Sequence, residues 1–194
     1  MAVLQPDGRV LETYATIVLR NGDVVALSAS VTNPGGMGDG RARGQTASMI
    51  PDYAGLLTDA EAISGIEHAI AVTVPASLLA PRIAYPAAAF DRDALTNPEP
   101  YAGTLPMGAR LALPAKFDLA ALRLQTATGR TIAAAAASYG FIVVDRGGEG
   151  VTLRVQPNGE RKVVALHAWD GALHADLRAI FAHLEQVPVA PAAP

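Results

Sequence analysis

Residues 105–145 restrict the possible folds more than any other part of this sequence. They predict a strand, a turn closed by Pro114, a helix and a second strand, because proline has no amide hydrogen to donate to a sheet. The helix is expected over residues 126–138, where five consecutive alanines combine high helical propensity with very small side chains. Gly140 suits the left-handed conformation that follows a helix, so the helix should end there. The segment therefore predicts a helix lying close to a sheet.

The start of the chain predicts a three-stranded antiparallel sheet. Residues typical of strands occupy positions 2–4, 10–19 and 24–31. The sequences Pro6-Asp7-Gly8 and Asn21-Gly22-Asp23 separate these strands, and both are typical of tight turns. The three strands are therefore expected to pair in chain order.

Residues 66–74 alternate in a way that predicts another strand, with His68 on the same face as the apolar Ile66, Ile70 and Val72. This alternation places the histidine on the buried side. Two interpretations of His68 stay open: a core histidine that hydrogen-bonds to the backbone, or a histidine that contacts a ligand at the edge of a groove.

Residues 75–106 are rich in proline and show little periodicity, so long loops are expected there. Within them, Asp91 and Asp93 are interpreted as surface charges. A turn at residues 146–150 predicts a hairpin that leads into a strand at 151–155. We assign no site to these segments.

The C-terminal part differs in character, because residues 172–186 place apolar side chains at helical spacing and predict an amphipathic helix. We therefore divide the chain into a β-rich domain over residues 1–168, a C-terminal helix within residues 169–187 and a Pro/Ala-rich tail over residues 188–194. The β-rich domain is expected to keep its fold when the chain is cut after Pro157.

Composition argues against several classes of function. The 194 residues are 51% hydrophobic but only 5% aromatic, which indicates one domain with an aliphatic core. A net charge of −3 gives no support for a nucleic-acid partner or an anionic membrane. The absence of cysteine excludes disulfides, cysteine–zinc sites and thiol nucleophiles. No apolar run approaches the roughly 18 residues of a membrane span, and the first residues do not resemble a signal peptide.

No catalytic motif stands out. The chain has no Gly-x-Ser-x-Gly sequence, and its four histidines lack the short spacing of a zinc site, so neither a metal nor a cofactor is expected. A glycine-rich loop over residues 33–44 offers the best polar cluster, since its backbone and charged side chains suit a sugar or a uronic acid. The expected ligand-binding residues are Asp39, Arg41, Arg43, His68 and Tyr139, and the candidates for catalysis are His68, Tyr139 and Asp145.

Three motifs carry a family resemblance: Gly-Ile-Glu-His-Ala from Gly65, close to the pattern Gly-x-Ile-x-His-Ala, Gly-Ala-x-Leu-x-Leu-Pro from Gly108, and Tyr-Gly-x-x-Val-x-Asp from Tyr139. Together with other segments between residues 2 and 156, they resemble a set of largely uncharacterised bacterial and phage-associated proteins, many of which have secretion signals. Phe141 stands where that set more often has tyrosine. The resemblance implies an extracellular or virion-surface β-rich domain and brings no established activity with it.

We therefore expect an α+β, β-rich fold, with a sandwich or jelly-roll-like sheet body, one alanine-rich packed helix and a C-terminal helix. The leading hypothesis for function is a non-catalytic extracellular or virion-surface module, such as part of a phage spike or fibre, that recognises polysaccharide. One alternative is a polysaccharide lyase or glycoside hydrolase that acts on a cell-surface or acidic glycan, with His68 paired to Tyr139 or Asp145. Another is a purely structural virion protein whose residues 172–186 pack against copies of the chain or other virion proteins.

Overall fold

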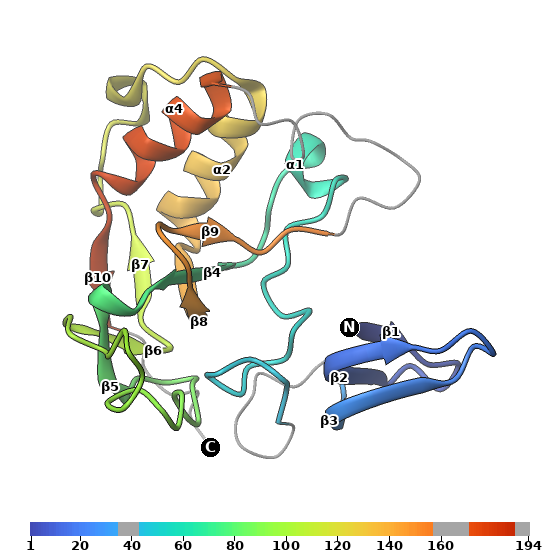
Figure 1. Ribbon diagram of the computed structural model, residues 1–194. Helices are drawn as coiled ribbons and strands as arrows, with labels where there is room; N and C mark the ends of the chain where they lie inside the picture. The colour runs from blue at the N-terminus through green and yellow to red at the C-terminus, as the bar shows by residue number, and fades with distance from the viewer. Residues whose placement is uncertain (35–42, 157–170, 189–194) are drawn as a thin grey trace, which may run out of the picture.

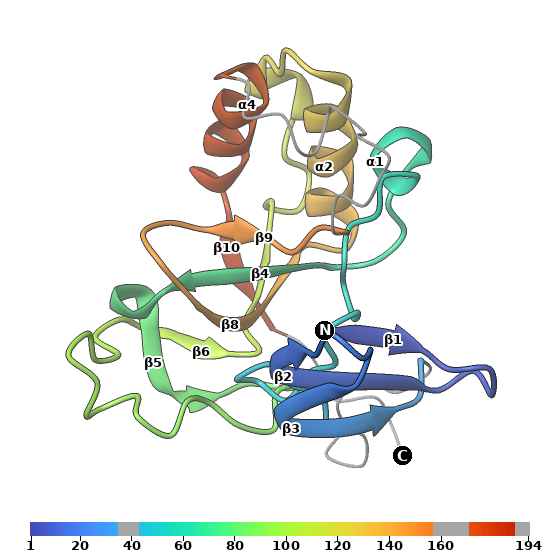
Figure 2. The same ribbon diagram turned by 45° about the vertical axis from the view of Figure 1, so that its right-hand side comes forward.

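A computed structural model describes residues 1–34, 43–156 and 171–188 (Figure 1). The chain is α+β and β-rich, with three sheets and two longer helices, and the described strands form no closed barrel. Figure 2 shows the helices above the largest sheet and the N-terminal sheet below it. The predicted site residues Asp39 and Arg41, and the predicted tail from residue 189 onward, lie outside the described residues.

The N-terminal sheet, which we call the meander, consists of β1 (Ala2–Leu4), β2 (Val10–Val18) and β3 (Val24–Thr32). Its strands pair antiparallel in chain order, as predicted. In the two turns, Gly8 and Gly22 take φ values of 82° and 88°, which glycine adopts without the steric penalty of a side chain. Local turn chemistry was therefore sufficient to predict this sheet.

The largest sheet has the strand order β10-β7-β8-β4-β9. Its members are β4 (Ile70–Pro75), β7 (Arg110–Ala112), β8 (Phe141–Gly147), β9 (Thr152–Leu153) and β10 (Glu185–Val187). Within this sheet, β4 and β8 run parallel, and every other described pair is antiparallel. Parallel neighbours need a long crossover connection, and residues 76–140 supply it here.

The alanine run forms helix α2 (Ala127–Ser138), as predicted. The helix begins where the Thr126 hydroxyl accepts a hydrogen bond of 2.8 Å from the Gly129 amide, which satisfies one of the free amides of the first turn. It ends before Gly140, which has a φ of 77°. Ile132 and three of the alanines are buried in the main core, so the small side chains do bring the helix close to the sheet.

Strand β8 is buried on both faces of the largest sheet. Phe141 and Val143 belong to the main core beneath the helices, whereas Val144 packs with Ile50 and Ala71 on the opposite face. A strand covered on both sides is a continuous apolar run in the sequence. Helices α2 and α4 (Gly171–Phe181) contribute to the main core, in place of the second large sheet that a sandwich would supply.

Two strand predictions differ from the structure. The strand predicted over residues 66–74 begins only at Ile70, because the preceding residues stay beside the short helix α1 (Glu61–Ser64), to which His68 is hydrogen-bonded. His68 is consequently half-exposed and does not lie on the buried face. The predicted hairpin after β8 is also wrong: β9 pairs with β4, because β8 already has β7 and β4 as neighbours and offers no free edge.

The connection expected as loops over residues 75–106 contains regular structure. A one-turn helix, η1 (Ala76–Leu78), leads into β5 (Leu79–Ile83), which pairs parallel with β6 (Leu105–Met107). Another short helix, η2 (Leu119–Leu122), precedes α2. These elements are brief, and the small sheet depends on a contact between segments far apart in the chain.

The predicted C-terminal helix is too long. Helix α4 ends at Phe181, and residues 185–187 form β10 on the open edge of β7. The helical spacing of apolar residues gives no information on the unpaired edge of β7, with which these residues pair. Ile180 is fully buried in the main core and Leu173 is buried as well, so these residues of the apolar stripe pack within the chain. The buried part of the stripe is therefore used within the single chain.

Candidate functional site

Polar side chains gather at the carboxyl end of the parallel pair. Asp145 and Arg146 are near the end of β8, beside a register shift between Val72 and Thr73 of β4. Irregularities of this kind redirect side chains and are common next to active sites. Three other parts of the chain bring charged groups to the same place. We call this group the Asp145 cluster, and its members are Asp52, Asp91, Asp93, Tyr101, Asp145, Arg146 and Arg154.

Arg154 lies between two carboxylates of the cluster. Its Nη2 atom donates to Oδ1 of Asp52, and its Nη1 atom is 4.0 Å from Oδ2 of Asp145. The contact to Asp145 is at the outer limit for an ion pair, so Asp52 is the principal partner of this guanidinium. Asp145 therefore keeps capacity to accept a further hydrogen bond.

Arg146 organises the other half of the cluster. Its Nη2 atom lies 3.3 Å from Oδ1 of Asp93 and 4.0 Å from Oδ1 of Asp91. The Tyr101 hydroxyl donates to Asp91, and burial together with this carboxylate raises the pKa of Tyr101, so the phenol keeps its proton. The Asn97 amide donates to Asp93 at 2.6 Å. These contacts hold both carboxylates in defined positions as hydrogen-bond acceptors.

The ionisation of Asp145 is unusual for an aspartate. Burial raises the pKa of this carboxyl group from its ordinary 3.8 to about 6, and the Asp91 carboxylate adds to the effect, against smaller contributions from neighbouring amides and Arg154. Both protonation states are therefore available close to neutral pH. Groups of this kind serve as acids, bases or adaptable hydrogen-bonding partners.

His68 lies at the opposite, amino end of the parallel pair. Its Nε2 atom is 3.1 Å from Oε1 of Glu61, and its Nδ1 atom is 3.0 Å from the carbonyl oxygen of Ala69. Both partners are acceptors, so only the doubly protonated ring donates to both. The other Glu61 oxygen accepts from the amide and hydroxyl of Thr58, at 2.9 and 2.7 Å, in a capping box. The ring is thus tied to the start of α1.

The structure does not bring the three candidates for catalysis together. Ile70 and Phe141, the first residues of β4 and β8, are register partners. His68 and Tyr139 each lie two residues before them, so both are at the amino end of the parallel pair. Asp145 is four residues beyond Phe141, which corresponds to about 13 Å along an extended strand. Pairing of His68 with Asp145 as acid and base is therefore not supported by the fold.

Arg43 begins the segment that leads to the Asp145 cluster, unlike His68 and Tyr139, which lie at the other end of the parallel pair. Arg43 is exposed, and the segment passes under β8, where the Ser48 amide donates to the carbonyl of Val144 at 3.1 Å. The Ala47 amide also lowers the pKa of Asp145. The segment that follows the glycine-rich loop therefore leads directly to the cluster, although neither Asp39 nor Arg41 is among the described residues.

Sequence reasoning missed most of the Asp145 cluster. Asp52 and Arg154 are 102 residues apart, and Asp93 and Arg146 are 53 apart, so no spacing rule connects them. Asp91 and Asp93 were interpreted as surface charges, yet both contact Arg146. The sequence offered only an indirect signal for this site: Asp145 is the last residue of the Tyr-Gly-x-x-Val-x-Asp motif, and Arg146 follows it immediately.

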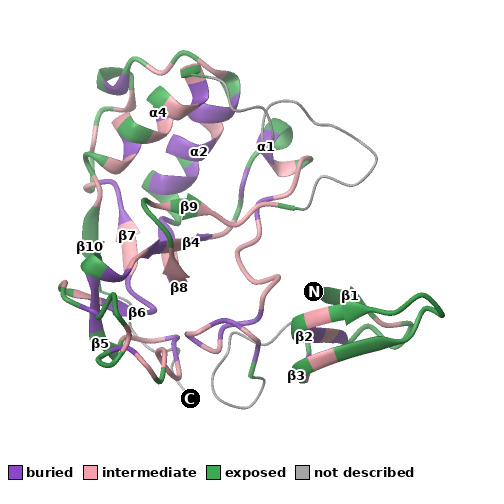
Figure 3. Ribbon diagram, in the orientation of Figure 1, coloured by how far each residue is buried: buried purple, intermediate pink, exposed green. Residues whose placement is uncertain are grey.

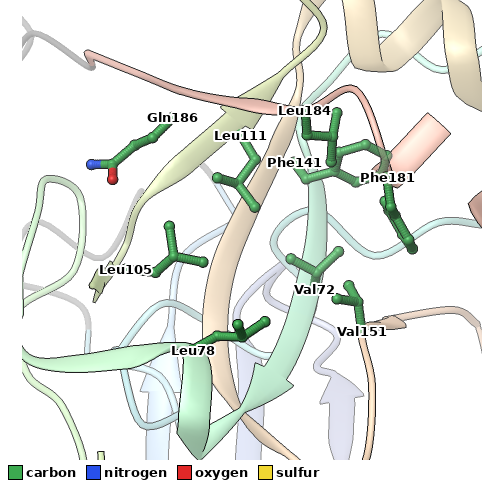
Figure 4. A pocket seen from close by; sticks show the side chains of 9 residues that line it. All are labelled: Val72, Leu78, Leu105, Leu111, Phe141, Val151, Phe181, Leu184 and Gln186. Carbon is green, nitrogen blue, oxygen red and sulfur yellow. The ribbon is translucent and has the colours of Figure 1, made fainter. Parts of the chain in front are cut away.

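An apolar pocket of about 250 Å³ lies beside the end of α4 (Figure 4). Val72 of β4, Phe141 of β8 and Phe181 of α4 point toward it, and Gln186 supplies the one polar side chain of its lining. A sugar would leave most of its hydroxyl groups without hydrogen-bond partners in such a pocket. We therefore do not assign this pocket to a polysaccharide.

The chain matches no protein-family model, no curated protein and no solved structure. The family resemblance of its motifs accordingly stays a prediction. Within the part of the chain that the structure describes, no three His, Cys, Asp or Glu side chains are grouped so that they could hold a metal ion. Across the same residues, no helix is both long and apolar enough for a membrane span. The Asp145 cluster is therefore the strongest basis for a function.

Proposed function

We propose that this chain is an extracellular or virion-surface module that recognises a polysaccharide through the Asp145 cluster without cleaving it. The side chains of Asp52, Asp91, Asp93 and Asp145 are 21% to 47% exposed, so a ligand can reach them. Carboxylates and guanidinium groups form charge-assisted hydrogen bonds with hydroxyl groups. Pairing among the cluster residues holds these groups in place before a ligand arrives, which lowers the entropic cost of binding.

The raised pKa of Asp145 is the observation that carries this proposal. The folded protein disfavours the ionised form relative to the unfolded chain, so this carboxylate reduces stability at pH 7. An asparagine of nearly the same size would avoid that cost. A group that reduces stability and is partly open to solvent is typical of a functional site.

The charge of the cluster favours a neutral sugar or an amino sugar. Both of its guanidinium groups already contact carboxylates, and the four carboxyl groups outnumber them. A uronic acid would bring another negative charge to this surface and be repelled. The acidic glycan considered from the sequence is therefore the less suitable ligand for this site.

Asp145→Asn is expected to stabilise the protein by about 3 kcal/mol at pH 7, because the pKa rises from 3.8 to about 6, one pKa unit corresponds to about 1.4 kcal/mol and asparagine cannot ionise. The folded state binds this proton more tightly than the unfolded state. Wild-type stability should therefore contain a contribution that falls as pH rises from about 4 to about 6 and then stays level. Urea unfolding across this range measures the difference between the two proteins.

The matched control for this change is Asp93→Asn. Hydrogen bonds from Asn97 and Arg146 hold the pKa of Asp93 below its ordinary value, so the substitution should not stabilise the protein. An Asp145→Asn protein that is less stable than wild type at pH 7 would show that the carboxylate has a structural role and remove the main support for a binding site.

The glycan proposal is tested by binding of neutral, amino and uronic-acid polysaccharides to the wild type, Asp145→Asn and His68→Ala. We expect the wild type to bind a neutral or amino glycan, and Asp145→Asn to bind at least about tenfold more weakly, which corresponds to about 1.4 kcal/mol. His68→Ala should keep its affinity, because His68 lies at the other end of the strands. No wild-type binding, or a loss confined to His68→Ala, would contradict the proposal.

Glycoside hydrolysis is the second candidate, and one feature of the same cluster favours it. A carboxyl group with a pKa of about 6 beside the Asp91 carboxylate resembles the acid and base pair of a glycosidase. A lyase that uses His68 as its base has less support, since both ring nitrogens contact acceptors. Release of reducing ends by the wild type, lost in Asp145→Asn, would favour hydrolysis over simple binding.

A further inference from the structure

The meander exposes an unusual amount of apolar surface. Sixteen large hydrophobic side chains are exposed among the described residues, and eleven of them belong to residues 1–31. Their exposed fractions run from 39% for Val3 to 79% for Leu27. Figure 3 shows the outer parts of β2 and β3 as almost entirely exposed. Isolated exposed apolar residues are ordinary, but a concentration on one small sheet marks an interaction surface.

One face of β3 carries much of this surface. Val25, Leu27 and Val31 alternate along the strand and therefore share a face, and Ile17 of β2 lies opposite Val25. We call these four residues the open face. The other face of β3 meets the body of the protein, where Ser28 and Ser30 hydrogen-bond to Gln45. The open face consequently points away from that contact.

The outer edge of β3 is also unprotected. Within the described residues, β2 pairs with one edge of β3 and no strand pairs with the other. The strand is nine residues long and contains neither a charged residue nor a proline. Natural proteins usually protect such edges with charges, prolines or bulges, because an open edge accepts a strand from another chain. Among the described residues, neither the edge nor the open face thus has a partner.

The meander is held firmly enough to present this edge in a fixed orientation. Glu12 of β2 is fully buried, and its carboxylate accepts hydrogen bonds from the Thr32 hydroxyl and from the amides of Gln45 and Asp52. These bonds, of 2.9 to 3.0 Å, connect two strands of the meander to the segment that crosses below β8. Binding through the edge therefore requires little ordering of the chain.

We propose that a second copy of this chain pairs with β3 edge to edge, antiparallel and centred on Ser28. This register places Val25 opposite Val31 of the partner subunit and Leu27 opposite the partner's Ala29. Residues with odd numbers then share a face across both copies, so the two open faces join into one apolar surface. No charged residue lies in either strand, which means that the two-fold pairing brings no like charges together.

The amount of apolar surface matches what a dimer requires. A large apolar side chain contributes on the order of 100 Å² when it is fully exposed. At the observed exposed fractions, the eleven side chains present on the order of 600 Å². A standard interface buries about 800 Å² per partner, of which about 500 Å² is apolar. The apolar surface of the meander is therefore large enough for a dimer interface, and edge pairing draws on the part of it that lies along β3.

The first test compares Leu27→Lys with Ile63→Lys by sedimentation velocity over a range of protein concentrations. The two side chains are similarly exposed, at 79% and 75%, but Ile63 belongs to α1 and lies outside the meander. We expect the wild type and Ile63→Lys to dimerise and Leu27→Lys to dissociate at least about tenfold more readily. A wild type that stays monomeric at high concentration, or equal weakening by both substitutions, would overturn the proposal.

The second test uses the absence of cysteine from the chain. Ser28→Cys should form a disulfide-linked dimer under mild oxidation, because directly opposed residues of antiparallel strands have Cα atoms about 4.5–5.5 Å apart, within the range of a disulfide. Tyr14→Cys is the matched control: Tyr14 lies beside Ser28 on β2, about three strand spacings, or 14 Å, from its copy. Equal cross-linking of both variants would overturn the proposed pairing of β3 with its copy.

Discussion

A chain cut after Pro157 is expected to lose cooperative folding, contrary to the prediction that residues before the C-terminal helix fold alone. The cut removes Ile180, which is fully buried in the main core, and Phe181, whose ring meets that of Phe141 edge-on at 5.3 Å. It also removes β10 from the edge of β7. Truncation of one buried isoleucine to alanine costs about 2–5 kcal/mol, and whole domains are stable by only about 5–15 kcal/mol. Losing the entire element should therefore exceed the available stability.

Two substitutions in the full chain separate this core role from an unspecific effect of truncation. Ile180→Ala should lower the free energy of unfolding by about 3 kcal/mol, whereas Arg178→Ala, on the exposed side of the same helix, should change it by less than about 0.5 kcal/mol. Chemical denaturation followed by circular dichroism measures both. A cooperative transition in the truncated chain, at an unchanged denaturant midpoint, would show that α4 is dispensable.

Asp176→Ala is expected to destabilise the protein by about 3 kcal/mol. This side chain is buried in α4, and its two oxygens accept hydrogen bonds from the amides of Gln125 and Thr126 and from the Thr126 hydroxyl, at 2.7 to 2.8 Å. Alanine would leave these partly buried donors without their acceptor, and a hydrogen bond to a charged group contributes about 1.5–3 kcal/mol. Thr126 caps α2, so the loss should also weaken the start of that helix.

The effect of Asp176 should depend on pH in the opposite direction from that of Asp145. Burial tends to raise the pKa of Asp176, but the hydrogen bonds from Gln125 and Thr126 outweigh burial and hold it below the ordinary 3.8. Its stabilising contribution is therefore complete above about pH 4 and is lost as pH falls through the lowered pKa. Unfolding of the wild type and Asp176→Ala should converge in acid and differ at neutral pH.

The control for Asp176 is Asp118→Ala. Asp118 also accepts a hydrogen bond from a backbone amide at the start of a helix, that of Ala120 at 3.0 Å, but it is exposed. Its removal should cost about 1 kcal/mol or less, because water replaces the lost acceptor. Equal effects of the two substitutions would mean that Asp176 acts as an ordinary exposed cap and does not join α4 to α2.

Elements that depend on neighbouring residues were predictable from the sequence. The alanine run, Thr126 before it and Gly140 after it define α2, and the apolar run that follows defines β8. The turns at Gly8 and Gly22 likewise predict the meander. In each case the determining interactions lie within a few residues, where propensity, capping and turn geometry act.

Local patterns of residues thus specify α2, β8 and the meander, whereas the pairing of β10 with β7 and the assembly of the Asp145 cluster arise only in the folded chain. The free edge of β7 exists only after the sheet has formed, so a segment with helical spacing could become a strand there. Asp52 and Arg154 meet across 102 residues for a similar reason. The energy of such contacts depends on the burial and geometry of the folded chain. A local pattern of residues therefore cannot predict which distant residues meet.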